Sequence, residues 1–369
     1  PATDFETAIS LEPDVARELP TQENGGISAD GRTYTFHLKD NIRWNSSPPR
    51  AVTAHDFVRA FKYFCNPVSP VGAPGYYTST IVGMTRYCAD FMKVPGTTAD
   101  IRRFMTTHEI EGVRAVDAST LVFTLRAPAT DFLNLLAMPF TSAVPEEYLN
   151  YLPDSPDFRR HTLSNGPYAV TRYVQNRQIE LARNPAWDPR TDPHRPAYVD
   201  QISIRLGVDG ELSQLQIEAG TADLTMDLSM LTADMASLRA INDPRVTLMP
   251  YGDRYGSMHY LAINLVGPNN GGALRDLRVR QAIALAVDKR AVAQVAGGPG
   301  VSLPLHQAVP SSVSGFRPGA DHFTTTNDQG DPATARRLLA QAGFPDGIKR
   351  DVREILDRKQ REIAVVSDE

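Results

Sequence analysis

The sequence predicts a mixed α/β protein with two lobes. Its 369 residues exceed the roughly 250 to 300 residues that one hydrophobic core usually serves. Segments that alternate like strands and segments with the period of a helix follow one another along the chain, which favours mixed sheets covered by helices. Hydrophobic residues at 41% and charged residues at 22% are typical of an ordinary globular protein.

The charge balance and the apolar runs narrow the possible partners. With 38 Lys and Arg against 43 Asp and Glu, the net charge is -5, so no overall positive field attracts a phosphate backbone. We therefore expect no nucleic-acid partner. The longest apolar runs, at 135–140 and 282–287, are far shorter than a bilayer crossing.

The chain opens at Pro1 without an export signal, so such a signal is either removed or not included in this sequence. Its absence therefore says nothing about the cellular location of the protein.

The first half of the chain interleaves strands and helices. Residues 33–38 alternate after the turn-forming pair Asp30 and Gly31, which predicts a half-buried strand. Residues 52–64 predict a helix that Thr53 caps. One face of this helix is apolar, formed by Phe57, Ala60, Phe61 and Phe64. A second strand is predicted at 121–125 and a short helix at 132–138.

The middle of the chain predicts a hairpin, further strands and one helix. After the turn at 165–168, residues 169–174 and 178–182 form the predicted hairpin. A helix at 212–219 carries Leu212, Leu215, Gln216 and Ala219 on one face and stops at Gly220. Further strands are predicted at 202–206, 246–249 and 258–265, the last of them apolar enough to be buried on both sides.

Two helices are predicted beyond the loop at 267–273. Apolar residues at i, i+3, i+4, i+7 and i+8 from Val279 to Val287 give the first helix one apolar stripe. Asp331 caps the second helix, and Gly343 ends it. Its predicted buried face consists of Ala335, Leu338, Leu339 and Ala342. The charged segment from Arg350 to Glu369 has few apolar anchors, and its role stays open.

The sequence contains no local motif of catalysis or of cofactor binding. It lacks the G-x-S-x-G nucleophile elbow and the phosphate-binding G-x-x-x-x-G-K-[ST] loop. The closest two of its eight histidines, His306 and His322, are 16 residues apart, so no helix face offers two imidazoles to a metal. We expect no cofactor and no metal site. A catalytic triad or carboxylate pair assembled from distant residues stays open, because such sites leave no spacing to detect.

The chain has two cysteines, Cys65 and Cys88, separated by 23 residues. This spacing is too long for a C-x-x-C redox or zinc pair. A disulfide and two reduced, partly buried thiols are both compatible with the composition.

Seven short segments, in order along the chain, resemble the extracytoplasmic oligopeptide, dipeptide and nickel solute-binding proteins of ABC importers, called family 5. Asp30–Lys39 looks like the family's D-G-x-x-Y-T-F-x-L-R/K strand, and Val52–Phe57 is similar to its T-A-x-D helix start. The most specific segment, Asp276–Arg290, is similar to D-x-R-V-R-Q-A-x-x-x-A-x-D-R. The other four are Asn165-Gly166-Pro167-Tyr168, Arg183-Asn184-Pro185-Ala186-Trp187, Gly220-Thr221-Ala222-Asp223 and Ala335–Gly343. The region 61–84, with its paired tyrosines, suggests the actinobacterial branch of the family.

This resemblance implies a periplasmic-binding-protein-like fold of type II, cluster C, with two lobes and mixed sheets. It covers roughly residues 10 to 347. Members of the family continue through most of a second lobe, so we expect that lobe to be only partly present. The implied domains are lobe I at 1–50, its accessory subdomain at 51–160, the second part of lobe I at 161–262, the start of lobe II at 263–347, and a tail of uncertain role at 348–369.

The resemblance also implies a function. A protein of this kind captures oligopeptides or a similar small solute between its lobes and delivers them to the permease of an ABC importer, without acting as an enzyme. It is extracytoplasmic, either secreted or held as a lipoprotein by an anchor that is not in this chain, and monomeric. In that setting the Cys65–Cys88 disulfide becomes the favoured interpretation. A ligand-sensing receptor on the same fold and a secreted hydrolase remain alternatives.

The resemblance further implies which residues contact the ligand. The peptide-facing strand end matches Met226 and Asp227, whose carboxylate would accept a hydrogen bond from an amino group or a peptide N–H. A solvated acid and buried tyrosines are the competing structural interpretations. The segment at 276–290 is expected to be structural. The complete implied set is Tyr76, Tyr77, Met226, Asp227, Tyr255 and Tyr260, with Tyr76 or Tyr77 reaching the cleft from the accessory subdomain.

Overall fold

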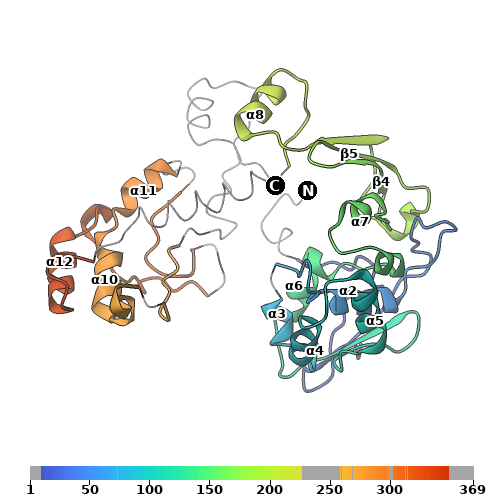
Figure 1. Ribbon diagram of the computed structural model, residues 1–369, viewed down its shortest axis with the longest axis horizontal. Coiled ribbons are helices and arrows are strands. Elements are labelled where there is room, and N and C mark those ends of the chain that lie inside the picture. Colours follow the sequence, from blue (N-terminus) through green and yellow to red (C-terminus); the bar gives the residue numbers. More distant parts are fainter. Residues whose placement is uncertain are drawn as a thin grey trace. The chain divides into compact units, whose positions relative to one another are not determined.

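The computed structural model in Figure 1 describes residues 10–226 and 258–348, except 73, 259, 268, 297, 299–301, 312 and 314. Contacts between Cα atoms divide the chain into two compact units, Pro1–Val208 and Asp209–Glu369, which we call unit 1 and unit 2. The predicted domain boundaries at 50, 160 and 262 stay predictions.

The first sheet of unit 1 has three antiparallel strands. They are β1 (Thr33–His37), β2 (Val113–Ala115) and β3 (Thr120–Thr124), in the order β1-β3-β2, with Thr35 opposite Val122. Phe123 on the central strand is buried and faces the core. The strands predicted at 33–38 and 121–125 are confirmed. The strand β2 is only three residues long, too short for a periodic pattern to show it.

The helix α2 (Ala54–Tyr63) packs against β2 and β3, as its apolar face predicts. The ring centroid of Phe61 lies 5.0 Å from that of Phe123 on the sheet, in an edge-to-face arrangement. Unit 1 contains further helices (Figure 1). They are α3 (Gly75–Thr78), α4 (Met84–Phe91), α5 (Thr98–Thr107), α6 (Phe132–Leu136) and α7 (Pro156–Arg160), with the 3-10 helices η1 (Pro139–Thr141), η2 (Glu146–Asn150) and η3 (Pro189–Thr191).

A disulfide joins the region after α2 to α4. Cys65 and Cys88 are bonded, with their Cα atoms 5.1 Å apart, and both side chains are buried in the core. The Tyr77 ring packs nearby, its centroid 4.7 Å from that of Phe64. The predicted disulfide is therefore present in the structure, where it joins the residues that follow α2 to α4.

The second sheet of unit 1 is built on the predicted hairpin. Its strands are β4 (Tyr168–Val174), β5 (Gln178–Arg183) and β6 (Gln201–Arg205), antiparallel and in that order. Asn176 in the turn between β4 and β5 has a φ of 56°, a left-handed conformation that asparagine tolerates well. The predicted strands at 169–174, 178–182 and 202–206 are confirmed.

Two of the family-like segments hold the hairpin to the rest of unit 1. The buried Asn184, from the Arg183–Trp187 segment, donates through its side-chain amide to the carbonyls of Ser164 and Gly166, at 3.1 and 2.9 Å. Its own backbone N–H donates to the Pro167 carbonyl at 2.8 Å. The turn at 165–168 and the segment after β5 therefore form one hydrogen-bonded unit, whose role is structural.

Unit 2 contains the helices α8 (Gly210–Glu218), α10 (Leu277–Ala286), α11 (Lys289–Val295) and α12 (Pro332–Gln341), with η4 (Asn269–Arg275) and η5 (Thr326–Asp328). Gly220 follows α8 with a φ of 68° and donates to the Ile217 carbonyl, which confirms the predicted stop. The α10 and α12 helices pack side by side through Val279 and Ala335, which are both buried (Figure 1).

One prediction for unit 2 is wrong. Residues 258 and 260–265, predicted as a doubly buried strand, are not in a strand, and Tyr260 and Leu261 are exposed. A continuous apolar run indicates burial, but a central strand also needs partner strands on both edges, and the described residues supply none. The helix predicted at 212–219 is confirmed as α8, and Leu212 and Leu215 on its predicted face are exposed. The strand predicted at 246–249 lies outside the described residues.

We predict that the Cys65→Ala/Cys88→Ala double variant unfolds with a free energy about 3 kcal/mol lower than that of the oxidised protein, because the bond restricts a loop of some two dozen residues in the unfolded chain. Urea unfolding of both proteins, followed by circular dichroism, measures the difference. A reducing agent should lower the stability of the original protein to that of the double variant and leave the double variant unchanged. Equal stability of the oxidised protein and the variant would contradict this role.

Candidate functional site

A buried carboxylate lies in the first turn of α2. The Asp56 side chain is only 2% exposed, and it belongs to the T-A-x-D segment. It accepts hydrogen bonds from the backbone N–H of Thr53 at 2.9 Å and from the indole N–H of Trp44 at 3.2 Å. Nη1 and Nη2 of the Arg50 guanidinium each donate to it at 3.1 Å. Each oxygen of this buried charge therefore has partners, as a carboxylate out of contact with water requires.

Arg50 also binds Glu147, a residue of η2, and so connects Asp56 to that helix. It donates to Glu147 through Nε at 2.9 Å and through Nη2 at 2.8 Å, so one guanidinium bridges two carboxylates. Burial raises the pKa of Asp56, but Arg50, the Thr53 N–H and Trp44 outweigh burial and hold that pKa below its usual range. Hydrogen bonds from Arg50 likewise lower the pKa of Glu147. Both carboxylates are ionised at neutral pH.

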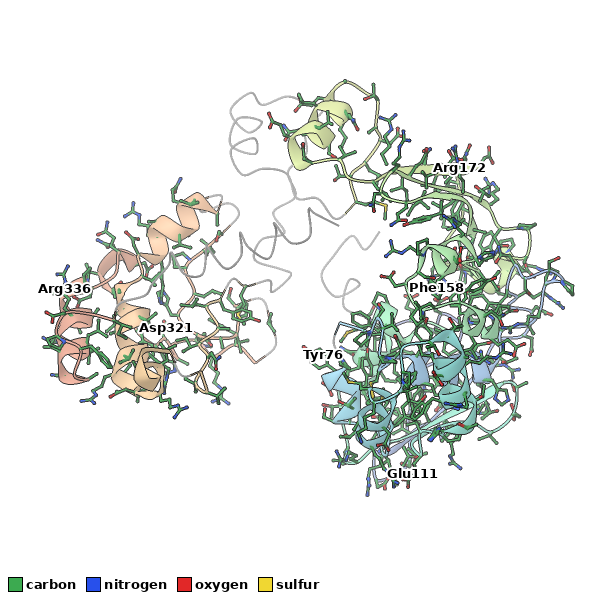
Figure 2. All side chains as sticks on the ribbon, viewed as in Figure 1. Tyr76, Glu111, Phe158, Arg172, Asp321 and Arg336 are labelled. Carbon is green, nitrogen blue, oxygen red and sulfur yellow. A yellow bond between two sulfur atoms is a disulfide. The ribbon has the colours of Figure 1, made fainter. Side chains whose placement is uncertain are left out.

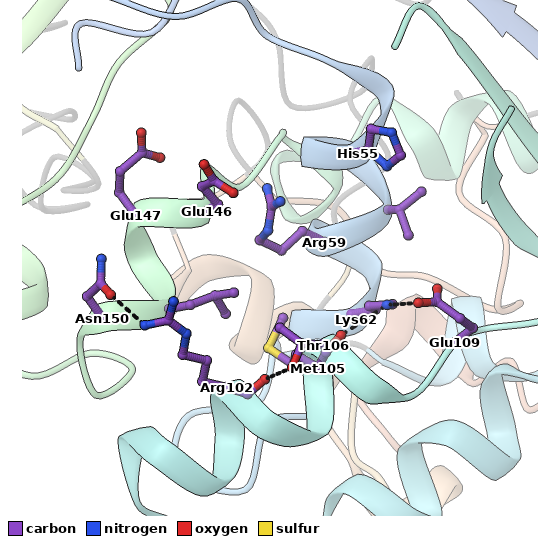
Figure 3. Close-up of a pocket in the computed structure, with 12 residues that line it drawn as sticks. His55, Arg59, Lys62, Arg102, Met105, Thr106, Glu109, Glu146, Glu147 and Asn150 are labelled. Atoms are coloured by element: carbon purple, nitrogen blue, oxygen red, sulfur yellow. Dashed lines mark hydrogen bonds and ion pairs between the residues drawn. The ribbon is translucent and has the colours of Figure 1, made fainter. Parts of the chain in front are cut away.

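A hollow of about 490 Å³ opens beside this network, between α2, α5 and η2 (Figure 3). On α2 the residues His55, Arg59 and Lys62 face it at the spacing i, i+4 and i+7, which places them on one side of the helix. Across from them lie Arg102 of α5 and Glu146 of η2. The buried side chains of Val58, Met105 and Leu149 form an apolar floor.

Two polar bridges close the edges of the hollow. The Lys62 ammonium, which is almost wholly buried, donates to Glu109 at 2.7 Å and to the Met105 carbonyl at 3.0 Å. Arg102 donates to the Asn150 side chain at 3.0 Å. These bridges join α5 to α2 on one side and to η2 on the other.

The structure separates the two tyrosines predicted in the accessory subdomain. Tyr77 is wholly buried, and its hydroxyl donates to the Leu135 carbonyl at 2.8 Å, so its ring belongs to the core. Tyr76 lies at the surface of unit 1 with 57% of its area exposed (Figure 2). Of the two, only Tyr76 offers a ring that a ligand can contact.

The other predicted ligand contacts belong to unit 2. Met226 and Tyr260 are 58% and 76% exposed, so both side chains are accessible. Asp227 and Tyr255 lie outside the described residues. The hollow of unit 1 was not predicted from the sequence. The available signal is the spacing of His55, Arg59 and Lys62, which places three polar side chains on one side of the predicted helix.

Within the described parts of the chain, no cluster of three or more His, Cys, Asp or Glu side chains has the arrangement of a metal site. Among those same residues, no helix is both long and apolar enough to cross a bilayer.

The comparison with protein families decides the class of the protein. The family model described as "Bacterial extracellular solute-binding proteins, family 5 Middle" matches residues 10–368. This chain belongs to family 5 of the solute-binding proteins. The resemblance of its seven segments is therefore confirmed, and the family is one of binding proteins and not of enzymes.

Two curated relatives of this family 5 protein carry names that refer to peptides. The chain is 27% identical over 318 residues to the periplasmic oligopeptide-binding protein OppA of Salmonella typhimurium, covering 85% of this chain and 53% of OppA. It is 26% identical over 342 residues to the dipeptide-binding protein of Escherichia coli, covering 89% of this chain and 56% of the relative. The chain thus spans about half the length of these curated relatives.

Solved structures confirm the fold. The clavulanic acid biosynthesis oligopeptide binding protein 2 matches with a TM-score of 0.70 and 27% identity, over 92% of this chain and 57% of that one. The murein tripeptide binding protein MppA of Escherichia coli matches with a TM-score of 0.62 and 22% identity, over 90% of this chain and 58% of that one. The predicted periplasmic-binding-protein-like α/β class is therefore confirmed.

We predict that Asp56→Asn lowers the free energy of unfolding by about 3 kcal/mol at neutral pH, because it leaves the Arg50 charge partly buried with one carboxylate fewer. The folded pKa of Asp56 is lowered, so its contribution is present above the unfolded value of about 3.9 and is lost as the pH falls through the folded value. The original protein should therefore lose more stability on acidification than the variant loses.

Denaturant unfolding at a series of pH values measures both effects. The matched control is Asp157→Asn, because Asp157 pairs with Arg160 at the surface and its side chain is 71% exposed. The control should change stability by less than about 0.5 kcal/mol. If Asp56→Asn were as stable as the control variant, the buried network would not have the role described here.

Proposed function

We propose that the protein captures oligopeptides, or a similar small solute, in a cleft between two lobes and delivers them to an ABC importer. The observation that supports this most directly is the family match over residues 10–368, together with relatives named for oligopeptide and dipeptide binding. Because the chain spans about half of these relatives, the activity of the whole protein is part of the proposal.

Peptide capture has a simple physical basis. Every residue of a peptide offers the same N–H and C=O groups, so hydrogen bonds from strand edges hold the main chain whatever the sequence. Roomy pockets then accept varied side chains. A ligand that contacts both lobes favours the closed state only by the difference between its affinities for the closed and open states. A permease that recognises the closed state would then accept the loaded protein.

The proposed ligand contacts are the accessible members of the predicted set. Tyr260 and Tyr76 offer an exposed aromatic face and a hydroxyl, and Met226 offers a flexible apolar side chain. Asp227 and Tyr255 complete the proposal from the sequence alone. We retain Tyr77 only as support, because its buried ring helps to hold the helix α3 that carries Tyr76.

We further propose an extracytoplasmic location, with the permease of an ABC importer as the partner. A lipid anchor and a secreted form are both compatible with the family, and a monomer suits a protein that closes around its ligand. The core disulfide supports an oxidising compartment, because such bonds persist outside the cytoplasm.

One relative points to a different ligand. Heme-binding protein A of Haemophilus influenzae is 27% identical over 341 residues, covering 89% of this chain and 54% of that protein. Identity is as high as with the oligopeptide-binding relative, so overall similarity does not separate the two ligands. Hemin is therefore the competing solute in the binding test.

We predict that short peptides of two to five residues bind the full-chain protein saturably in isothermal titration calorimetry. Tyr260→Ala should weaken the affinity about tenfold, because an aromatic contact in a closed site contributes more than 1 kcal/mol. The matched control is Tyr198→Ala, since Tyr198 is another exposed tyrosine, in unit 1 and outside the predicted set. Binding of hemin without binding of any peptide would contradict the peptide proposal, as would the absence of binding by either.

A further inference from the structure

The hollow between α2, α5 and η2 is built entirely from residues 55–150, and none of the predicted peptide contacts lines it. Its volume of about 490 Å³ falls within the range of small-molecule sites, roughly 300 to 1,000 Å³. Its apolar floor of Val58, Met105 and Leu149 lies among charged side chains, a combination that fixes the orientation of a small ligand. The hollow is thus a second place where this protein can bind a solute.

The cations of the hollow keep free hydrogen-bond donors. Arg59 uses only Nη1, which donates to Asp56 at 2.7 Å and to the Val144 carbonyl at 2.8 Å. Its Nε and Nη2 groups have no partner among the residues that the structure describes. Arg102 likewise uses only Nη1, toward Asn150. Two guanidinium groups, one of them held rigidly by Asp56, can therefore receive a carboxylate.

One anion of the hollow is also free. Glu147 is engaged by Arg50 and Glu109 by Lys62, whereas the side chain of Glu146 has no ion pair or hydrogen bond within the described part of the chain. Figure 3 shows the side chains of Glu146 on η2 and Arg59 on α2 pointing toward one another across the hollow. An unpaired carboxylate thus faces unsatisfied guanidinium donors, and no ion pair joins them.

From this arrangement we infer that the hollow binds a zwitterionic α-amino acid with an apolar side chain. Its ammonium group would donate to Glu146, and its carboxylate would accept from Arg59 and Arg102. The side chain would cover the floor of Val58, Met105 and Leu149. An α-amino acid carries its ammonium and its carboxylate on the same α-carbon, so one small molecule can reach both sides of the hollow while its side chain leaves water.

The test uses the full chain and L-leucine as the probe, with calorimetry and saturation-transfer NMR as the measurements. Isocaproate lacks the ammonium group of leucine, and isoamylamine lacks its carboxylate. We expect saturable binding of leucine and affinities at least about tenfold weaker for both analogues, because each loses one charge-assisted hydrogen-bonding group. If either analogue bound as tightly as leucine, or if leucine did not bind, the inference would be overturned.

Variants assign the binding to this hollow. Glu146→Gln keeps the size of an exposed side chain that has no partner, so the variant should fold normally and bind leucine about tenfold more weakly. The matched control is Glu111→Gln, an exposed glutamate of unit 1 outside the hollow, which should leave the affinity unchanged. Leucine binding that is equally strong in Glu146→Gln and in the original protein would contradict the assignment.

Separate variants test the amino-acid site in the hollow and the peptide site in the cleft, so either proposal can be wrong while the other holds. Leucine binding in the hollow should be insensitive to Tyr260→Ala, and peptide binding in the cleft should be insensitive to Glu146→Gln. Loss of leucine binding in Tyr260→Ala would place the amino acid in the peptide cleft and would overturn the inference, while the peptide proposal would stand.

Discussion

The hydrogen bonds and ion pair of the buried Asp56 carboxylate hold α2 to the segment around η2 in unit 1. A carboxylate removed from water costs several kcal/mol unless hydrogen bonds and an opposite charge replace the water. Arg50 supplies that charge and binds Glu147 at the same time, and the Val144 N–H donates to the Asp56 carbonyl at 3.0 Å. The start of α2 and the segment around η2 are thereby held together. The hollow lies between these two elements and α5, so the network fixes two of its three walls.

Three of the segments that identify the family have structural roles. The T-A-x-D segment provides Asp56, the Arg183–Trp187 segment provides the buried Asn184, and Asp276 caps α10 by accepting from the Arg278 N–H. Each fixes the course of the backbone through hydrogen bonds that few other residue types can make. This explains why the sequence predicts the family well and the ligand poorly. Side chains that line a pocket have no such backbone constraint, so a relative named for heme resembles this chain as closely as one named for oligopeptides.

Sequence reasoning succeeded where local signals and packing agree. The helices α2, α10 and α12 have both a capping residue and an apolar stripe, and the β4–β5 hairpin has a turn residue suited to a left-handed conformation. It failed where the outcome depends on distant partners. The apolar run at 258–265 predicts burial but does not identify the strands that would pair with it. The burial of Tyr77 beside the exposed Tyr76 follows from the packing of α3 on Phe64, which adjacent positions in a sequence do not specify.

The location of the hollow within unit 1 constrains what occupancy there can do. A ligand shifts an equilibrium between two arrangements of lobes only by the difference between its affinities for them. An amino acid whose contacts all lie within residues 55–150 keeps the same contacts in both arrangements, as long as the Asp56 network holds α2 and η2 in place. Binding in the hollow would then leave the closure equilibrium unchanged. A peptide that contacted both lobes would change that equilibrium directly, so the two proposed sites would differ in their effect: occupancy of the cleft would shift the arrangement of the lobes, and occupancy of the hollow would not.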